Sequence, residues 1–192
     1  MLQSTLSPVW IFGYGSLIWR TDIPYVEKQP ARVIGFERRF WQASTDHRGI
    51  PGAPGRVLTL VPTPGAQCVG MIFRLPSGEE EAILRHLDHR EKNGYERQPI
   101  EVELTAEGEE IINAITYLAP PHNPHFLGDA PLSDMASQII DAHGPSGSNL
   151  AYLLELEKEL VAHGIRDSHI ETLALAVRKL QSQCGHPFRE SR

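Results

Sequence analysis

The fold is decided close to the start of the chain by the stretch Val9-Trp10-Ile11-Phe12-Gly13-Tyr14-Gly15-Ser16-Leu17. Its apolar run predicts a buried strand, and the two glycines predict a tight turn directly after it. The stretch is not a dinucleotide-binding fingerprint, because that motif needs a third glycine where Ile18 stands. A glycine-flanked turn can instead present successive backbone N–H groups to a carboxylate or a phosphate. A tight turn with Tyr14 packed on the core accounts for the same residues, so both interpretations stay open.

Five further stretches have the composition of strands: residues 33–41, 57–61, 68–73, 99–104 and 111–118. The turn Thr63-Pro64-Gly65 separates the second of these from the third and predicts a hairpin. An acidic turn around Gly108 joins the last two.

Four helices are expected at residues 77–90, 132–143, 149–163 and 168–181. The first should open with a capping box, since Ser77 and Glu80 have the Ser-x-x-Glu spacing. Gly144 and Gly164 stand where left-handed carboxyl-terminal caps belong.

The order of these elements predicts an α+β fold, because strands come first, helices follow, and one helix is inserted between strands. We expect a closed or strongly curved, barrel-like mixed sheet with helices around it. Residues 1–192 should form a single domain with short flexible ends at about 1–8 and 185–192.

The composition is that of an ordinary globular protein, with 41% hydrophobic and 22% charged residues among 192. Two cysteines, Cys68 and Cys184, are too few for a disulfide framework, and Cys68 has the setting of a small buried hydrophobic residue. The net charge of −6 and the lack of a basic run argue against nucleic acid as a partner. Neither a signal peptide nor an 18-residue apolar run is present, so we expect a cytoplasmic protein without a membrane partner.

Glu91 is the strongest candidate for acid–base chemistry. If the helix at residues 77–90 continues, its carboxylate shares a face with Ile83, Leu84 and Leu87, which should point at the core. Burial raises the pKa of a carboxyl group toward the range in which it can accept and return a proton at neutral pH. The alternative is a helix-end glutamate paired with Lys92 or Arg97. Glu81, in the first turn, fits a solvated residue that complements the helix dipole.

A second cluster of chemical groups is Ser44-Thr45-Asp46-His47-Arg48-Gly49, beside a stiff loop of glycines and prolines. Arg48 is suited to holding a substrate carboxylate through two parallel hydrogen bonds. Asp46 and His47 also suggest a catalytic triad with Ser44 or Ser16. We do not favour that hypothesis, because neither serine stands in a Gly-x-Ser-x-Gly nucleophile elbow.

A metal centre could be imagined at the histidine pairs His86 with His89 and His122 with His125. We do not favour it either, since no fixed third ligand or cysteine cluster accompanies them. We therefore expect no cofactor and no metal.

Several ordered blocks together resemble the ChaC family of γ-glutamylcyclotransferases acting on glutathione, over residues 9 to about 180. The most telling are Ile11-Phe12-Gly13-Tyr14-Gly15-Ser16-Leu17 and Leu87-Asp88-His89-Arg90-Glu91-Lys92-Asn93-Gly94-Tyr95. The other matching blocks are residues 9–19, 38–42, 44–49, 54–57 and 144–149.

The resemblance implies a small cyclotransferase fold and a lyase that cleaves glutathione into 5-oxoproline and Cys-Gly. It implies that the turn residues hold the γ-glutamyl head: Ile11, Phe12, Gly13, Tyr14, Gly15, Ser16 and Leu17. It also implies that Glu91 is the catalytic acid and base and that Glu81 influences substrate access.

Further residues are candidates for contact with the rest of the substrate. Arg48 and Arg56 are candidates for the glycine carboxylate of glutathione, Tyr95 and Tyr117 for lining the pocket, and Ser44 for a polar contact beside Arg48. The expected partner is glutathione alone, and the expected state is a monomer or a weak homodimer. Two alternatives stay open: a cyclotransferase for other γ-glutamyl amino acids or amines, and a non-catalytic glutathione-binding regulator of cation transport.

Overall fold

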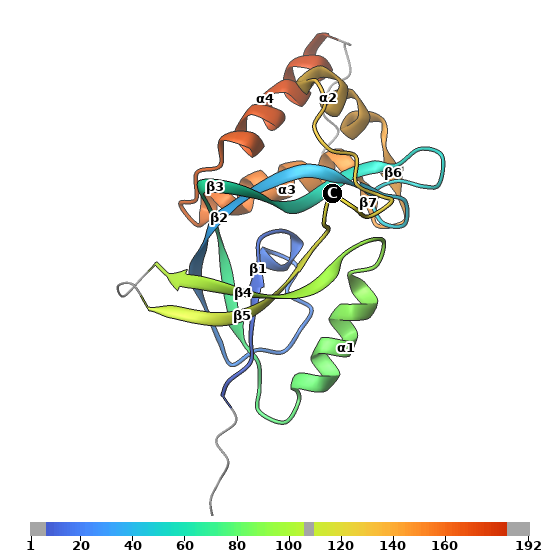
Figure 1. Cartoon of the computed structure of the whole chain (residues 1–192). Coiled ribbons are helices and arrows are strands. Elements are labelled where there is room, and N and C mark those ends of the chain that lie inside the picture. Colours follow the sequence, from blue (N-terminus) through green and yellow to red (C-terminus); the bar gives the residue numbers. More distant parts are fainter. Residues whose placement is uncertain (1–6, 106–109, 184–192) are drawn as a thin grey trace, which may run out of the picture. The chain divides into compact units, whose positions relative to one another are not determined.

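The structure is a computed structural model that describes residues 7–105 and 110–183 (Figure 1). The ends predicted to be flexible lie outside the described residues, apart from Ser7 and Pro8. The acidic turn around Gly108 and the second cysteine, Cys184, lie outside them as well.

Within the described residues, five strands form a closed barrel in the order β1-β3-β2-β4-β5. The strands are β1 (Trp10–Gly13), β2 (Glu27–Ser44), β3 (Gly55–Arg74), β4 (Glu96–Leu104) and β5 (Ile111–Leu118). The short strand β1 closes the barrel, because it pairs antiparallel with β3 and parallel with β5, where Ile11 lies opposite Ile115. The prediction of an α+β fold with a barrel-like mixed sheet is therefore confirmed.

Two compact units can be distinguished in the chain. The first holds the described residues up to Arg38 together with Leu60–Pro120. It contains β1, most of β2 and β3, β4, β5, a 3-10 turn η1 (Ser16–Ile18) and the helix α1 (Glu80–Arg90). The second holds Arg39–Thr59 and the described residues from Pro121 onward. Both β2 and β3 run without interruption from one unit into the other.

The second unit contains three long helices and a two-stranded ribbon. The helices are α2 (Leu132–Asp141), α3 (Asn149–Ala162) and α4 (Ser168–Gln183), and the ribbon joins β6 (His143–Gly144) to β7 (Gly147–Ser148). Each helix buries one apolar face, with side chains such as Ile139, Leu156 and Leu173 inaccessible to solvent. Full burial of one such side chain contributes roughly 1.5–3 kcal/mol, so helix–helix packing holds this unit together.

The core of the first unit includes buried side chains of β1, β3 and α1. Ile11, Phe12 and Phe73 are at most 1% exposed, and Leu87 is the residue of α1 that is buried as completely. This core fixes the end of β1, and with it the turn that follows.

The predicted hairpin at residues 57–73 is wrong, because β3 is a single strand over that whole range. Gly65 takes a left-handed backbone conformation with φ of 78°. A glycine inside a strand can absorb a bend in this way without ending the strand. The Pro-Gly pair therefore marks a bend, not a reversal.

The predicted capping box is also wrong. Helix α1 begins at Glu80 instead of Ser77, and its N-cap residue, Glu79, makes no side-chain capping bond. The Glu80 carboxylate accepts a hydrogen bond of 2.7 Å from the backbone N–H of Gly78. Gly78 has a φ of 89°, so the chain turns once more before the helix starts.

The two glycines predicted as helix caps behave differently. Gly164 follows α3 with φ of 68°, as predicted. Gly144 is not a cap, because it belongs to β6, and α2 ends earlier at an extended Ala142. A Cβ atom at Gly144 would lie 2.3 Å from the carbonyl oxygen of His47, so glycine is needed there for close approach of two backbones.

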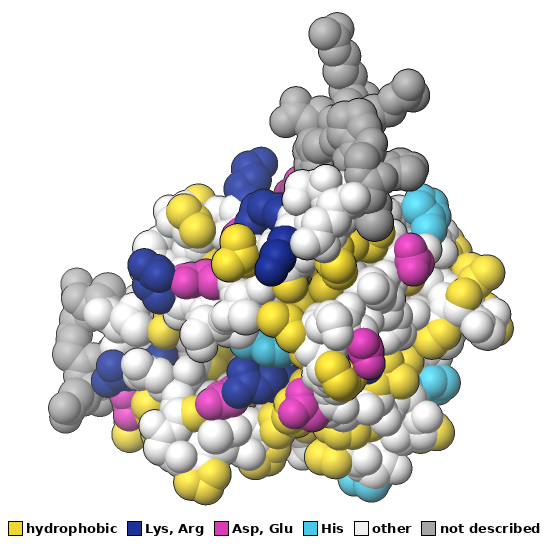
Figure 2. Space-filling view, turned by 90° about the horizontal axis from the view of Figure 1, so that it is seen from above, with side chains coloured by type: hydrophobic (Ala, Val, Ile, Leu, Met, Phe, Trp, Pro, Cys, Tyr) yellow, Lys and Arg dark blue, Asp and Glu magenta, His cyan; other side chains and the backbone are white. Residues whose placement is uncertain are grey.

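The surface mixes charges of both signs. On the face drawn in Figure 2, Lys and Arg side chains lie among Asp and Glu side chains, with apolar side chains between them. None of the helices in the described part of the chain has the length and apolar character needed to cross a membrane.

Candidate active site

The turn after β1 is the centre of the candidate site. A 3-10 turn begins at Ser16, and the backbone closes on itself through Ile18 N–H to Gly15 O at 2.9 Å and Arg20 N–H to Ser16 O at 2.7 Å. Gly13 is needed for this geometry, because a Cβ atom there would lie 2.8 Å from Cβ of Leu17. The sequence prediction of a tight turn directly after a buried strand is confirmed.

Tyr14 fixes the turn to the barrel. Its side chain is buried, and its hydroxyl donates a hydrogen bond of 2.7 Å to the carbonyl oxygen of Tyr117 on β5. Its own carbonyl oxygen accepts a bond of 2.6 Å from Nε of Arg38, which is 2% exposed and also donates to the carbonyl oxygen of Val69. Tyr14 therefore packs on the core and shapes the turn, so the two interpretations of this stretch are compatible.

Glu91 lies at the carboxyl end of α1 as its C-cap residue, with φ of −89° and ψ of 61°. The helix ends at Arg90, so the condition for a position on the core face of α1 is not met, and that position stays a prediction for Glu91. Its side chain is still only 20% exposed, and it lies 3.3 Å from Nε of Arg90. That cation favours the ionised carboxylate, whereas partial burial disfavours it.

Arg90 connects Glu91 to the turn. Its Nη2 donates a hydrogen bond of 2.7 Å to Oγ of Ser16, and its Nη1 forms an ion pair with Asp22. The same Nη1 lies 3.3 Å from the carbonyl oxygen of Arg20. The side chain of Arg90 is 15% exposed. Glu91 and Ser16, far apart in the sequence, thus share one guanidinium.

A second connection runs from α1 to β5 and back to the turn. The hydroxyl of Tyr117 donates a hydrogen bond of 2.6 Å to Oδ1 of Asp88, and Arg97 lies 3.4 Å from the other carboxylate oxygen. Burial raises the pKa of the Tyr117 phenol, and Asp88 and Glu91 raise it further. Tyr14, Tyr117 and Asp88 therefore link the turn, β5 and the end of α1.

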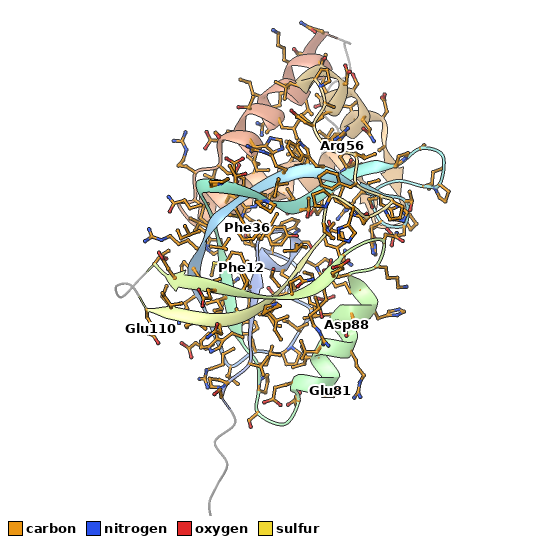
Figure 3. All side chains as sticks on the ribbon, viewed as in Figure 1. Phe12, Phe36, Arg56, Glu81, Asp88 and Glu110 are labelled. Carbon is orange, nitrogen blue, oxygen red and sulfur yellow. The ribbon has the colours of Figure 1, made fainter. Side chains whose placement is uncertain are left out.

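Two other predicted residues, Glu81 and Tyr95, also belong to the first unit. Figure 3 shows Glu81 near the start of α1 and Asp88 near its end. Glu81 is 79% exposed and lies 3.5 Å from Arg85. Ten helical steps place it about 15 Å from Glu91 along the axis. Tyr95 is half-buried in the segment between Glu91 and β4.

Ser44 and Arg48 belong to the second unit and contact each other. Oγ of Ser44 accepts a hydrogen bond of 2.9 Å from the backbone N–H of Arg48. The guanidinium of Arg48 lies 5.2 Å from the ring centre of Tyr152 and donates to the carbonyl oxygen of Ser148 at 3.3 Å. Arg48 is half-buried.

Arg56, the other predicted carboxylate ligand, has a structural setting. Its side chain is 6% exposed, and its Nε donates to Oε1 of Gln138 at 2.7 Å. Its Nη1 donates to the carbonyl oxygens of Phe40 and Gly128, each at 3.1 Å. Burial lowers the pKa of this guanidinium, and Asp129 and Asp134 oppose the shift. These contacts favour a role in holding the second unit together over a role in binding substrate.

The alternative chemistries gain no support from the contacts. The ring of His47 faces Ser146, with Nδ1 3.0 Å from Oγ, while Nε2 lies 3.6 Å from Asp46. The hydroxyl groups of Ser44 and Ser16 are engaged by Arg48 and Arg90. Within residues 7–105 and 110–183, no group of three or more His, Cys, Asp or Glu side chains is arranged to hold a metal ion. Cys68 is buried, as expected.

Sequence reasoning missed Arg38, Asp88 and Arg90 as parts of this arrangement. All three stand in the blocks that carry the family resemblance, which was the available signal. A partner 74 residues away, such as Ser16 for Arg90, cannot be read from local spacing.

Comparisons with known proteins show the family of the chain. The model of the family described as ChaC-like protein matches residues 9–180. The chain is 39% identical to γ-glutamylcyclotransferase 2-3 of Arabidopsis thaliana over 181 residues, which covers 91% of each protein. It is 36% identical to human glutathione-specific γ-glutamylcyclotransferase 1, over 88% of this chain and 78% of the human protein.

A solved structure shares the fold. The crystal structure of the yeast γ-glutamylcyclotransferase specific to glutathione superimposes with a TM-score of 0.85 at 31% identity, over 91% of this chain and 97% of that one. The chain therefore belongs to the ChaC-like protein family. The resemblance seen in the sequence blocks is confirmed.

Proposed function

We propose that the protein is a glutathione-specific γ-glutamylcyclotransferase, a lyase that converts glutathione into 5-oxoproline and Cys-Gly. The relatives named for this activity support the proposal. The observation that carries it is the pairing of Glu91, through Arg90, with the turn at Ser16. The reaction needs a group that transfers protons and a rigid binding site for the γ-glutamyl head, and a carboxylate beside a glycine-rich turn can supply both.

The reaction is intramolecular. The α-amine of the γ-glutamyl group attacks the γ-carbonyl carbon, a new C–N bond closes the lactam, and the amide bond to cysteine breaks. The ammonium gives up two protons in total, and the departing cysteine nitrogen gains two, so the protons balance. Holding the chain folded for attack replaces a covalent nucleophile, since effective molarities of well-oriented intramolecular reactions reach about 10⁵ M or more.

Glu91 is the group we assign to the proton transfers. As a carboxylate it accepts a proton from the substrate ammonium, and as a carboxylic acid it returns a proton to the leaving nitrogen. Nε of Arg90 lies 3.3 Å from the Glu91 carboxylate, and a positive charge at that distance favours the ionised form that can accept a proton.

The turn formed by Ile11, Phe12, Gly13, Tyr14, Gly15, Ser16 and Leu17 is the group we assign to the γ-glutamyl head. Backbone N–H groups in such a turn can hold the α-carboxylate and the oxyanion. Removing one oxyanion donor costs about 3 kcal/mol in comparable enzymes. Two hydrogen bonds fix Tyr14, and Arg90 holds the hydroxyl of Ser16; both observations support this assignment.

Fewer residues can be assigned to the Cys-Gly part of the substrate. We keep Arg48, supported by Ser44, as the candidate for the glycine carboxylate, and Tyr95 and Tyr117 as residues that line the pocket. We no longer favour Arg56 in that role, because its donors serve the protein. We propose a cofactor-free cytoplasmic enzyme that is a monomer or a weak homodimer.

The test is direct. Purified protein given glutathione without added metal should release 5-oxoproline and Cys-Gly. Glu91→Gln should lower turnover by about 10²–10⁴-fold, the contribution typical of general acid–base catalysis. Glu101→Gln, on the exposed side of β4, serves as the matched control and should keep full turnover. Full activity of Glu91→Gln with an unchanged melting temperature would overturn the assignment.

A second candidate substrate class has one observation in its favour. The name of the Arabidopsis relative specifies γ-glutamylcyclotransferase without naming glutathione. Competition between glutathione and γ-glutamylalanine would separate the two, because a strict glutathione enzyme ignores the second compound. Tight glutathione binding without turnover would instead favour a regulatory protein.

A further inference from the structure

We propose that Arg90 is a positioning residue, which ties the substrate-binding turn to the catalytic carboxylate and keeps that carboxylate ionised before substrate binds. The inference rests on the proposed function. It assigns to Arg90 an effect on the position and charge of Glu91, and this effect does not require Arg90 to contact substrate.

The contacts of Arg90 show how one residue can hold the turn and also lie beside the catalytic carboxylate. Each of its three nitrogen atoms contacts a different side chain: Nη2 contacts Oγ of Ser16, Nε contacts Glu91, and Nη1 contacts Asp22. A planar guanidinium presents its donors in a fixed fork, so fixing two partners also fixes the third. The position of Glu91 is thereby coupled to the position of the turn.

The bond to Ser16 also sets what that hydroxyl can do. Because the guanidinium donates to Oγ, the hydroxyl acts as acceptor in this bond and its own hydrogen stays available for another acceptor. A substrate carboxylate bound by the turn is such an acceptor. Arg90 thus prepares Ser16 to donate.

The positive charge of Arg90 is shared by two carboxylates, those of Asp22 and Glu91. Arg90 pairs with Asp22 as well as with Glu91, so its charge is shared and Glu91 can still accept a proton from substrate. Other ionisable groups pair with members of this cluster or with their neighbours. His86 lies 3.7 Å from Asp22, and Asp88 contacts both Arg97 of β4 and Tyr117 of β5.

Three substitutions test the proposal. Arg90→Gln removes the charge, so Glu91 binds a proton at higher pH, and the acidic limb of the kcat/KM profile should move up by about one pH unit. Its KM should rise about tenfold, because the hold on Ser16 is lost. Arg90→Lys keeps the charge but not the fork, so the limb should stay in place while KM rises. Arg85→Gln, on the exposed side of the same helix, is the control and should match wild type.

A fourth variant moves the limb in the opposite direction. Asp22→Asn removes the competing carboxylate, so Glu91 is the carboxylate left beside Arg90 in this cluster and the acidic limb should move to lower pH. This variant keeps the proposal testable if Arg90→Gln proves too unstable to assay. Combining Ser16→Ala with Arg90→Gln should raise KM little beyond the larger single effect, since the two residues act through one bond.

The outcomes separate this inference from the proposed function. An acidic limb that coincides with wild type in both Arg90→Gln and Asp22→Asn would overturn the role of Arg90 while the enzyme assignment stands. A wild-type protein that releases no 5-oxoproline would overturn the proposed function itself. Melting temperatures equal to wild type would show that the shifts do not come from unfolding.

Discussion

The hydroxyl of Tyr117 holds its proton strongly, because burial and the Asp88 carboxylate both disfavour the phenolate. A group whose pKa is raised on folding stabilises the protein below its ordinary pKa, and this stabilisation is lost as the pH rises further. For a tyrosine that ordinary value is about 10. The stabilisation that Tyr117 contributes is therefore lost only in alkaline solution.

This gives a prediction at the scale of one residue. Tyr117→Phe should lower the free energy of unfolding by about 1 kcal/mol near neutral pH, the typical net value of one hydrogen bond. Between about pH 9 and about pH 11 wild type should lose more stability than the variant, because the variant lacks the titrating phenol. Urea unfolding at the two pH values measures both effects.

The matched control is Tyr25→Phe, since the Tyr25 side chain is 44% exposed. It should leave the pH dependence of wild type unchanged. Equal losses of stability in wild type and Tyr117→Phe on going to alkaline pH would show that Tyr117 is not the group responsible.

At the scale of elements, β3 approaches β1 so closely that glycine is required at position 70. A Cβ atom at Gly70 would lie 2.4 Å from the carbonyl oxygen of Gly13 and 2.9 Å from the ring of Phe12. Backbone oxygen cannot move away as a flexible side chain can. The end of β1, from which the turn departs, is therefore positioned by the absence of a side chain on β3.

Gly70→Ala should accordingly impair both folding and activity. Overpacking of this kind costs about 1–3 kcal/mol, and the displaced turn should lower kcat/KM for glutathione at least tenfold. Gly65→Ala in the same strand is the control. Its φ of 78° makes alanine cost about 1–2 kcal/mol, but nothing lies within 4 Å of the added atom, so kcat/KM should be unchanged. A loss of kcat/KM in the control alone would contradict this account.

Elements with a strong local signal were predicted well from the sequence. The range of β5 was predicted to the residue, and α3 starts at Asn149 as expected, because the side chain of Ser148 caps it at 3.1 Å from the N–H of Ala151. The bend at Gly65 and the start of α1 were not predicted, since both depend on neighbours distant in sequence. The same reason explains why some site residues were predicted and others were missed. Glu91 was suggested by its spacing from Leu87 and by the family blocks, whereas the partner that makes Arg90 important, Ser16, is 74 residues away.

At the scale of the whole molecule, each unit is assembled from two separate stretches of chain. Strands β2 and β3 continue from one unit into the other without a break. Unfolding either unit would free one end of both strands. We therefore expect one cooperative transition, in keeping with the prediction of a single domain.

Two probes in one variant can check this. In Trp41→Phe the remaining tryptophans, Trp10 and Trp19, report on the first unit, while far-UV circular dichroism reports mainly on α2, α3 and α4 of the second. The two urea unfolding curves should coincide. Separate midpoints would mean that the chain holds two domains.

The pairing of β1 with β5 has a consequence for biosynthesis. The ribosome releases Ile11 about a hundred residues before its partner Ile115, so the earliest strand waits with an open edge while most of the barrel is made. Nascent or prematurely terminated chains that lack β5 present that edge to other molecules and are prone to aggregate.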